Sequence, residues 1–349
     1  MKRLTSMCAL LGMTTIVLAG AGCRKTQDDA FRGGVPTREA VVLHLPGAPD
    51  DGGGTTSAST TTTTSGSTAT VHSALLGQQA DTYTITRDVT AVVNGGTWAV
   101  LTLVRTIVGY PATTVATDSA VWGPYTDALS ANTWRLTVTR TQPHEYVWLL
   151  EARAKTEGND AFRTIISGDH TAAVDAQDDP IEGFGNGTFK IDWDAAATLP
   201  EHDTNVGKAA FTYSRLTPTA VVTVDVDFTG IEDQTTKEIF NAVYRYTSTP
   251  GQGGTLGYAE DKDNYPTPIG TGPAKEHFTI DSRWTEDGVG RCDLEDSGGD
   301  LMTTVAHGSE CWDASFASVY RDLEYPDAAG NWGAESACTA FPTASYSNL

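Results

Sequence analysis

Basic residues are scarce in this 349-residue chain, which carries 23 lysines and arginines against 44 aspartates and glutamates and a formal net charge of −21. Its first 22 residues hold two of the bases and no acid, so the remainder has 21 bases against 44 acids, a net charge of −23. Nucleic acids and anionic lipid headgroups both repel such a surface. We therefore expect no nucleic-acid partner. The acidic surface favours solubility, but charge alone does not identify any other partner.

Recognisable catalytic motifs are also missing. The sequence contains no G-x-S-x-G, H-E-x-x-H, Walker or EF-hand pattern. Its seven histidines are dispersed, and glycine-rich runs at 183–187 and 251–254 precede predicted strands, whereas a phosphate site needs the start of a helix. We expect a non-enzymatic protein with no catalytic residue, cofactor or metal site. Three acidic clusters are interpreted as solvated turns in preference to weak calcium sites: Asp175-Asp178-Asp179, Asp261-Asp263 and Asp293-Asp296-Asp300.

The one long apolar run lies at the N-terminus. Lys2 and Arg3 precede Met7–Ala19, which is too short to span a bilayer stably. A basic start followed by a short apolar run is typical of a secretory signal peptide, which we place at residues 1–22. No later stretch approaches the roughly 18 uninterrupted apolar residues of a membrane helix.

The signal peptide ends in Ala19-Gly20-Ala21-Gly22-Cys23, which resembles the lipobox of bacterial lipoproteins. In that family the cysteine is diacylated on sulfur and becomes the mature N-terminus. We therefore predict lipidation of Cys23 and attachment to the cell envelope. Arg24, rather than an aspartate, follows the cysteine and favours the outer membrane, facing the periplasm or the surface. Gly20 stands where the family usually has leucine, so ordinary cleavage near Ala21 is the alternative.

Cysteine is scarce too, with five in the chain. Cys8 leaves with the signal peptide and Cys23 carries the lipid, so Cys292, Cys311 and Cys338 remain in an oxidising compartment. Three thiols form one disulfide and leave one free, and spacing alone leaves all three pairings open. A bond between Cys311 and Cys338 would most reduce disorder, because it would cross-link a tail rich in glycine, proline and aspartate. No C-x-x-C or nearby histidine pair supports a metal site instead.

Composition divides the mature chain into two parts. Residues 23–75 are rich in threonine, serine and glycine, which predicts a lipidated, disordered tether with a reach of roughly 40 Å. The threonine tract within this range could also carry attached glycans. The exception is Ala40–Leu45, an apolar island that could add an edge strand or dock onto the domain. Residues 76–349 are predicted to form one β-rich globular domain.

The segment from Asp81 to Gly109 combines helical apolar spacing with many β-branched residues. Apolar residues recur at helical intervals on both sides of Asn94-Gly95-Gly96, which favours two short helices with the glycines ending the first. The alternative is a hairpin in which Asn94-Gly95 forms a type I′ turn between two strands.

After Tyr125 the apolar pattern changes to period two, which predicts strands. Trp134–Val138 and Tyr146–Ala152 form a predicted hairpin, and Val222–Phe228 alternates apolar with polar residues. Short polar turns without helix-length connections indicate an antiparallel meander. The predicted fold is mainly β, with about ten strands in one curved sheet, a half-barrel or barrel, and the early helices on its concave face. Further strands are expected at 162–167, 187–193, 209–215, 239–247, 255–259, 278–284 and 302–306.

Eight tryptophans and twelve tyrosines invite a glycan-binding interpretation, because aromatic rings stack on sugars. Trp134, Trp148 and Trp284 alternate with aliphatic neighbours, which favours core packing. Trp122 and Trp332 lie in loop-like settings and are the candidates for ligand stacking.

Several short motifs occur in an order that resembles a group of uncharacterised bacterial lipoproteins. They are W-G-P-Y at 122–125, S-R-W at 282–284, G-x-G-R at 288–291 and E-C-W-D-A-S-F at 310–316. The resemblance covers roughly residues 77–340 and brings no assigned activity. It implies a Cys311–Cys338 disulfide, which leaves Cys292 as the free thiol. A looser likeness, to periplasmic lipoprotein carriers, concerns only the architecture of a curved half-barrel sheet that holds acyl chains against inner helices.

The leading hypothesis is therefore a cell-envelope lipoprotein that acts as a binding or structural module, with the membrane as its partner through the N-terminal lipid. The alternative is a carrier of apolar or acyl ligands in the concave sheet, which a large apolar cavity would support. A remote third hypothesis is an exported hydrolase, which would require a cleft that pairs a histidine with a carboxylate and a hydroxyl group. The identity of an apolar or glycan ligand stays open.

Overall fold

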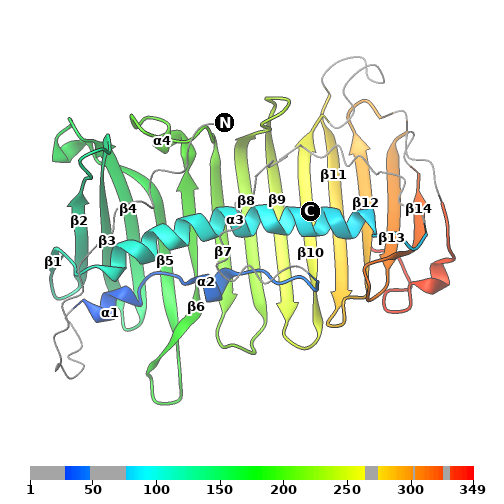
Figure 1. Ribbon diagram of the computed structural model, residues 1–349, viewed down its shortest axis with the longest axis horizontal. Coiled ribbons are helices and arrows are strands. Elements are labelled where there is room, and N and C mark those ends of the chain that lie inside the picture. Colours follow the sequence, from blue (N-terminus) through cyan, green and yellow to red (C-terminus); the bar gives the residue numbers. More distant parts are fainter. Residues whose placement is uncertain (1–27, 48–75, 264–273, 302, 325–330) are drawn as a thin grey trace.

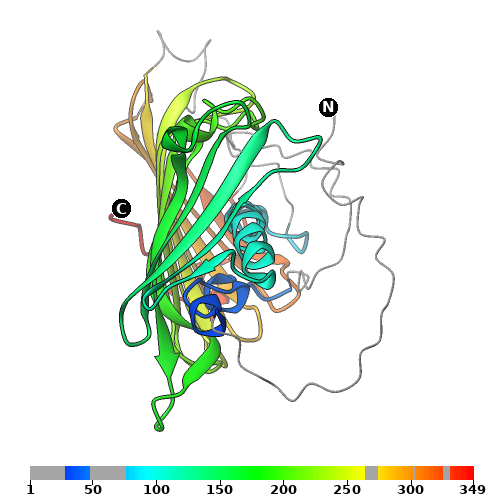
Figure 2. The same cartoon turned by 90° about the vertical axis from the view of Figure 1, so that its left-hand side faces the viewer.

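The computed structural model describes residues 28–47, 76–263, 274–301, 303–324 and 331–349. Their strands form one antiparallel sheet in which each strand pairs with its neighbours in sequence, so β1 and β14 are the two edges (Figure 1). Within the described residues the sheet curves around a long helix and stays open (Figure 2). The strands are β1 (Thr114–Val115), β2 (Ser119–Tyr125), β3 (Asn132–Gln142), β4 (Glu145–Ala154), β5 (Arg163–Val174), β6 (Pro180–Asp192), β7 (Lys208–Arg215), β8 (Val222–Glu232), β9 (Ile239–Thr249), β10 (Gly253–Lys262), β11 (Glu276–Thr285), β12 (Gly290–Gly298), β13 (Val305–Trp312) and β14 (Ser318–Leu323).

One long helix, α3 (Asp81–Gly109), crosses the concave face from the β14 side to the β1 side (Figures 1 and 2). The other helical segments described have three or four residues each. They are α1 (Asp29–Arg32), α2 (Arg38–Val41), α4 (Trp193–Ala196) and the 3-10 turns η1 (Asn159–Ala161) and η2 (Glu335–Ala337).

The predicted fold class, an antiparallel meander in one curved sheet, is confirmed. In β8, Val222, Val224 and Val226 are buried, and the polar residues between them are more exposed, as the alternating pattern predicts. The predicted hairpin is β3–β4, in which Trp134 lies opposite Ala152. Of the half-barrel and the barrel, the open form is the one observed.

The sheet has more strands than the pattern predicted, because β1, β2, β12 and β14 were not anticipated, and the strand expected at 302–306 begins later, as β13. β12 was missed because its middle, Cys292-Asp293-Leu294-Glu295-Asp296, is rich in acids, which are depleted in strands. Neighbouring segments accommodate these acids on both faces of the sheet, as described below.

The region 81–109 corrects the prediction of two short helices. α3 is one helix of 29 residues that continues through Asn94-Gly95-Gly96, so the alternative hairpin is not formed either. Each glycine costs about 1 kcal/mol relative to alanine inside a helix. Burial of Val93, Leu101 and Val104 outweighs that cost, because fully burying one such side chain contributes about 1.5–3 kcal/mol.

The threonines of α3 are compatible with its burial. Thr86, Thr90 and Thr97 donate their hydroxyl protons to the carbonyls of Thr82, Thr86 and Val93 one turn earlier. This bonding satisfies hydroxyl groups on the buried side of the helix. By length and composition α3 could also cross a membrane, a property that it shares with core helices of soluble proteins; here it lies against the sheet.

Residues 28–47, hereafter the strap, run beside α3 on the concave side of the sheet (Figures 1 and 2). Phe31, Val35 and Leu43 of the strap are buried in the larger apolar cluster. Asn94 of α3 binds the strap with both ends of its amide: the Leu43 N–H donates to Asn94 Oδ1, and Asn94 Nδ2 donates to the Leu43 carbonyl, each at 3.0 Å. Asn94 therefore holds the strap against α3, although the sequence pattern predicts that a helix ends at this position.

The strap falls inside the range 23–75, for which composition predicts a disordered tether. Residues 28–47 instead belong to the globular part, and the apolar island Ala40–Leu45 docks onto the domain, one of the two outcomes expected for it. Residues 1–27, which include the predicted signal peptide and Cys23, lie outside the described residues, as do residues 48–75.

The described core consists of two apolar clusters. The larger joins the strap and the C-terminal half of α3 to strands β2–β10 and to Trp284 of β11. The smaller joins the start of α3 to strands β11–β14 and contains Ala80, Tyr83, Phe278, Ile280, Cys292, Leu294, Trp312 and Leu323.

Candidate functional site

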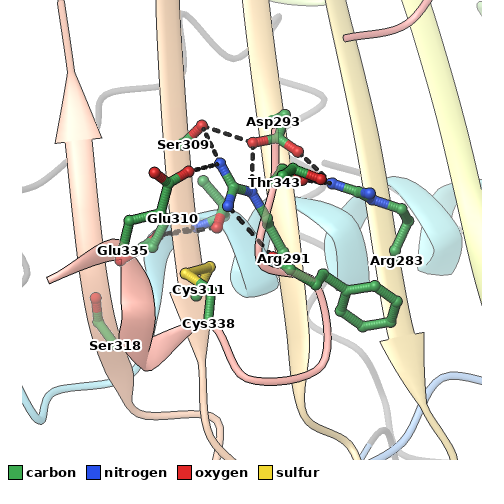
Figure 3. The surroundings of a disulfide bond; sticks show 12 residues. Arg283, Arg291, Asp293, Ser309, Glu310, Cys311, Ser318, Glu335, Cys338 and Thr343 are labelled. Carbon is green, nitrogen blue, oxygen red and sulfur yellow. Dashed lines mark hydrogen bonds and ion pairs between the residues drawn. A yellow bond between two sulfur atoms is a disulfide. The ribbon is translucent and has the colours of Figure 1, made fainter. Parts of the chain in front are cut away.

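A disulfide joins Cys311 of β13 to Cys338, which follows η2 in the C-terminal tail (Figure 3). This pairing, with Cα atoms 5.6 Å apart, is the one that the resemblance to bacterial lipoproteins implied. Cys292 is the free thiol and is completely buried. Burial raises the pKa of the Cys292 thiol, so this cysteine behaves as a small apolar side chain and not as a nucleophile.

Beside the disulfide lies a group of polar side chains that we call the tail cluster: Arg283, Arg291, Asp293, Ser309 and Glu335 (Figure 3). Asp293 is its centre, because its carboxylate accepts hydrogen bonds from Arg291 Nε at 2.8 Å, from an Arg283 guanidinium nitrogen at 2.5 Å and from the Ser309 hydroxyl at 2.6 Å. Arg291 reaches the Glu335 carboxylate at 3.0 Å. Arg291 and Asp293 are both 1% exposed.

The tail cluster lies on the convex face of the sheet, away from α3. Arg291 and Asp293 alternate with Cys292, which packs with Tyr83 of α3 in the smaller apolar cluster. The C-terminal tail covers this convex surface, where the Ser345 N–H donates to Asp293 at 2.9 Å. Every charge at the centre of the cluster has a partner of opposite sign, so its geometry suits the attachment of the tail rather than ligand binding.

A second buried group, which we call the rim carboxyls, lies on the opposite face of the sheet, mainly on β10, β11 and β12. It comprises Asp233, Glu260, Lys262, Glu276 and Asp296, each no more than 6% exposed. Register places Lys262 of β10 opposite Glu276 of β11, and Glu260 two residues away, opposite Phe278, which in turn lies opposite Asp296 of β12. Asp233, after β8, forms an ion pair with Lys262. The Lys262 ammonium also attracts the Glu260 carboxylate.

Asp296 is the rim carboxyl whose pKa lies near neutral pH. Burial, reinforced by the charges of Glu276 and Glu260, raises the pKa of Asp296 to about 7. Burial also raises the pKa of Glu260, although a hydrogen bond from Tyr258 at 2.6 Å opposes that shift. Asp296 Oδ1 has no hydrogen-bond partner among the described residues. The described residues contain no group of three or more histidine, cysteine, aspartate or glutamate side chains arranged for a metal ion.

Sequence reasoning missed the rim carboxyls because acidic residues were assigned to turns. A usable signal was present in β10, where Leu256, Tyr258, Glu260 and Lys262 share one strand face. Because Glu260 and Lys262 continue the face that begins with Leu256 and Tyr258, this pattern predicts that both charged side chains are buried. The cluster Asp293-Asp296-Asp300 is likewise divided, because Asp293 and Asp296 lie on opposite faces of β12.

Two of the described histidines, His170 and His277, make short contacts with polar side chains. His170 is buried and its Nδ1 lies 2.8 Å from the hydroxyl oxygen of Tyr213; burial lowers the pKa of His170 to about 4, with a further contribution from Arg105. His277 pairs with a carboxylate, but its other ring nitrogen is bonded to the Leu349 carbonyl. His170 thus contacts a hydroxyl group and His277 a carboxylate, and the two rings lie on different strands, β5 and β11.

The two tryptophans proposed for ligand stacking are not available as flat exposed surfaces. Trp122 is completely buried, and its indole N–H donates to the Tyr110 carbonyl at 2.9 Å, so that prediction is wrong. Trp332 is partly buried, and the Arg321 guanidinium lies 4.8 Å from its ring centre. The exposed large aromatic side chains among the described residues are instead Trp98, Tyr110 and Tyr125.

An open hollow of about 820 Å³ lies beside α1. Asp29, Asp118, Arg140 and His144 are among its lining residues. This lining contains both acidic and basic side chains, so it favours no ligand of one charge. No family model, curated protein or solved structure matches this chain.

Proposed function

We propose that this protein is a lipid-anchored module of the bacterial cell envelope that binds or supports other envelope components and does not catalyse a reaction. The sequence support is the signal peptide followed by Cys23 in a lipobox-like setting. The structural observation that favours the proposal is that the chain is built into the fold from Asp28 onward, only five positions after Cys23. Asp28 Oδ2 accepts the Ala112 N–H at 3.0 Å and binds Arg32 at 2.9 Å.

The carrier alternative has less support. The middle of the concave face, where an acyl chain would lie, is occupied by α3 and the strap, whose apolar side chains form one cluster with the sheet. An acyl ligand would therefore have to displace the strap. Mass spectrometry of lipid extracted from the purified native protein tests this directly, and a stoichiometric acyl ligand would favour the carrier.

Labelling with a radioactive fatty acid tests the anchor. Wild-type protein should take up label and fractionate with membranes, whereas Cys23→Ser should do neither and should retain the fold. Cys292→Ser is the matched control, because it removes a buried thiol and should leave labelling unchanged. Wild-type protein that is unlabelled and soluble, with a mature N-terminus at Gly22 or Cys23, would contradict the proposal.

A further inference from the structure

The docking of the strap places the lipid attachment point at one end of the sheet. Cys23 precedes Asp28 by five residue steps, and a chain of that length extends at most about 18 Å. Asp28 is buried and bound to the loop after α3. The acyl chains on Cys23 would therefore hold this end of the domain close to the bilayer, whereas the composition alone had predicted a separation of roughly 40 Å.

The segment that binds Asp28 is unusual in a chain of such high negative charge. Residues 106–117 contain no charged side chain. They comprise the end of α3, the loop that follows it, β1 and the two residues after β1, and they lie beside α1 at the same end of the sheet (Figure 1). Arg32 of α1 donates to the Tyr110 carbonyl at 3.1 Å, which joins the start of the strap to this uncharged segment.

Two exposed tyrosines complete this surface. Tyr110 is 50% exposed and Tyr125 is 42% exposed, and the Tyr125 hydroxyl donates to the Pro111 carbonyl at 3.4 Å. Tyrosine is enriched at membrane interfaces, where an apolar ring and a polar hydroxyl group meet lipid and water. We call residues 106–117 together with Tyr125 the anchor edge.

The charges of the connecting residues agree with this placement. Arg24 and Lys25 are the two charged residues between Cys23 and Asp28, and both are basic. Basic residues next to a lipid anchor are attracted to anionic headgroups, whereas the rest of the acidic domain is repelled. The edge itself carries no charge, and the neighbouring acids Asp29 and Asp118 are paired with Arg32 and Arg140, so this edge can approach an anionic surface with little repulsion.

We propose that the anchor edge faces the lipid bilayer when Cys23 is acylated, so that the sheet extends away from the membrane with β14 at its far end. This proposal rests on the lipid anchor proposed above. Strands in a sheet are spaced about 4.8 Å apart, so the path along the sheet from β1 to β14 is roughly 60 Å. The two ends of the domain should therefore differ strongly in their distance from lipid.

The test uses the full lipidated chain in phosphatidylcholine vesicles that contain a headgroup-linked nitroxide quencher. A fluorophore is attached at Thr114→Cys on the anchor edge or, as the matched control, at Ala314→Cys in the exposed turn between β13 and β14. We expect at least fivefold stronger quenching at position 114 than at position 314. Inserting 20 glycine and serine residues between Lys25 and Thr26 should reduce the quenching at position 114 by more than half.

Equal quenching at the two positions, or stronger quenching at position 314, would overturn the membrane-facing edge. The proposed function is assessed separately, by fatty-acid uptake and flotation of the same samples with the vesicles. A chain that is acylated and floats but shows equal quenching rejects only the orientation. A chain that takes up no fatty acid and does not float rejects the anchor itself. Cys23→Ser carrying either fluorophore gives the background level.

Discussion

The two halves of the sheet are held together in different ways. Strands β2–β9 pack on the strap and the C-terminal half of α3 through the larger apolar cluster, with aromatic side chains such as Trp148 and Phe189 completely buried. Strands β11–β14 pack on the start of α3 through the smaller apolar cluster, and from β10 onward the sheet buries charges on both faces, the rim carboxyls on one and the tail cluster on the other. In this second half a disulfide and a covering tail replace part of the apolar core.

This difference shows how one meander tolerates acidic strands. A charged side chain can be buried only when it is neutralised or paired, because transfer of an unpaired charge out of water is strongly unfavourable. Asp293 is paired with two arginines. Asp296 is instead protonated below neutral pH, because its pKa is raised to about 7. The two solutions predict different responses to mutation and to pH.

The largest effect is expected from breaking the tail cluster. Asp293→Ala leaves Arg291 buried with Glu335 as its remaining carboxylate partner, so the free energy of unfolding should fall by about 3–5 kcal/mol. Asp227→Ala is the control, because Asp227 forms an exposed ion pair with Arg245 and its loss should cost less than about 1 kcal/mol. Urea unfolding measures both, and equal losses would contradict the contrast between the halves.

Asp296→Asn tests the rim carboxyls. The pKa of Asp296 is about 7 in the folded protein and about 4 when unfolded, so the folded state holds the proton more tightly. Its stabilising contribution is present below pH 4 and is lost as the pH rises to 7, by up to about 4 kcal/mol. The asparagine variant should therefore exceed the wild type in stability at pH 8. Parallel curves of unfolding free energy between pH 4 and pH 8 would refute this.

Removing the disulfide should have a slightly smaller effect. The bond spans 27 residues, and the loop-entropy model gives about 3.5 kcal/mol for its loss in Cys311→Ser/Cys338→Ser. Hydrogen exchange should accelerate first in residues 331–349 and in β13, with little change in β2–β8. Cys292→Ala serves as the control, with an expected loss of about 1 kcal/mol. If hydrogen exchange accelerated equally in all strands, the two halves of the sheet would not be stabilised independently.

The apolar half should respond to pH in the opposite direction, through His170. Burial lowers its pKa to about 4 from an ordinary value of about 6.5, so the unfolded state binds the proton more tightly. The stabilising contribution is present above pH 6.5 and is lost as the pH falls to 4, by up to about 3 kcal/mol. His170→Gln should flatten this acid limb, measured by urea unfolding at pH 7, 5 and 4. An unchanged acid limb would remove His170 as its cause.

The smallest effect concerns the attachment of the strap. Asn94→Ala removes two hydrogen bonds to Leu43, and we expect a loss of about 1–2 kcal/mol. Limited proteolysis should then cut within residues 28–47 faster than in the wild type. Thr102→Ala, an exposed change on the same helix, is the control. Unchanged proteolysis would mean that apolar burial alone holds the strap.

Local patterns in the sequence determined the fold class. A period of two residues is enough to assign strands such as β8, and short polar turns between them imply an antiparallel meander, because both signals lie within a few neighbouring residues. The compartment predicted from the N-terminus reduced the disulfide to three pairings, and resemblance indicated the observed one. The lipid on Cys23 stays a prediction from the sequence.

Tertiary structure decided the features that depend on contacts between distant residues. α3 continues through Asn94-Gly95-Gly96 because Asn94 binds Leu43, 51 positions away, and because the sheet buries one side of the helix. Asp293 and Asp296 occur in the same acidic stretch of the sequence, but they lie on opposite faces of β12. Asp293 therefore pairs with Arg283 and Arg291, whereas Asp296 lies among the rim carboxyls. Short-range spacing encodes which conformation a segment prefers, whereas the environment of each side chain exists only after the strands, strap and tail have packed together.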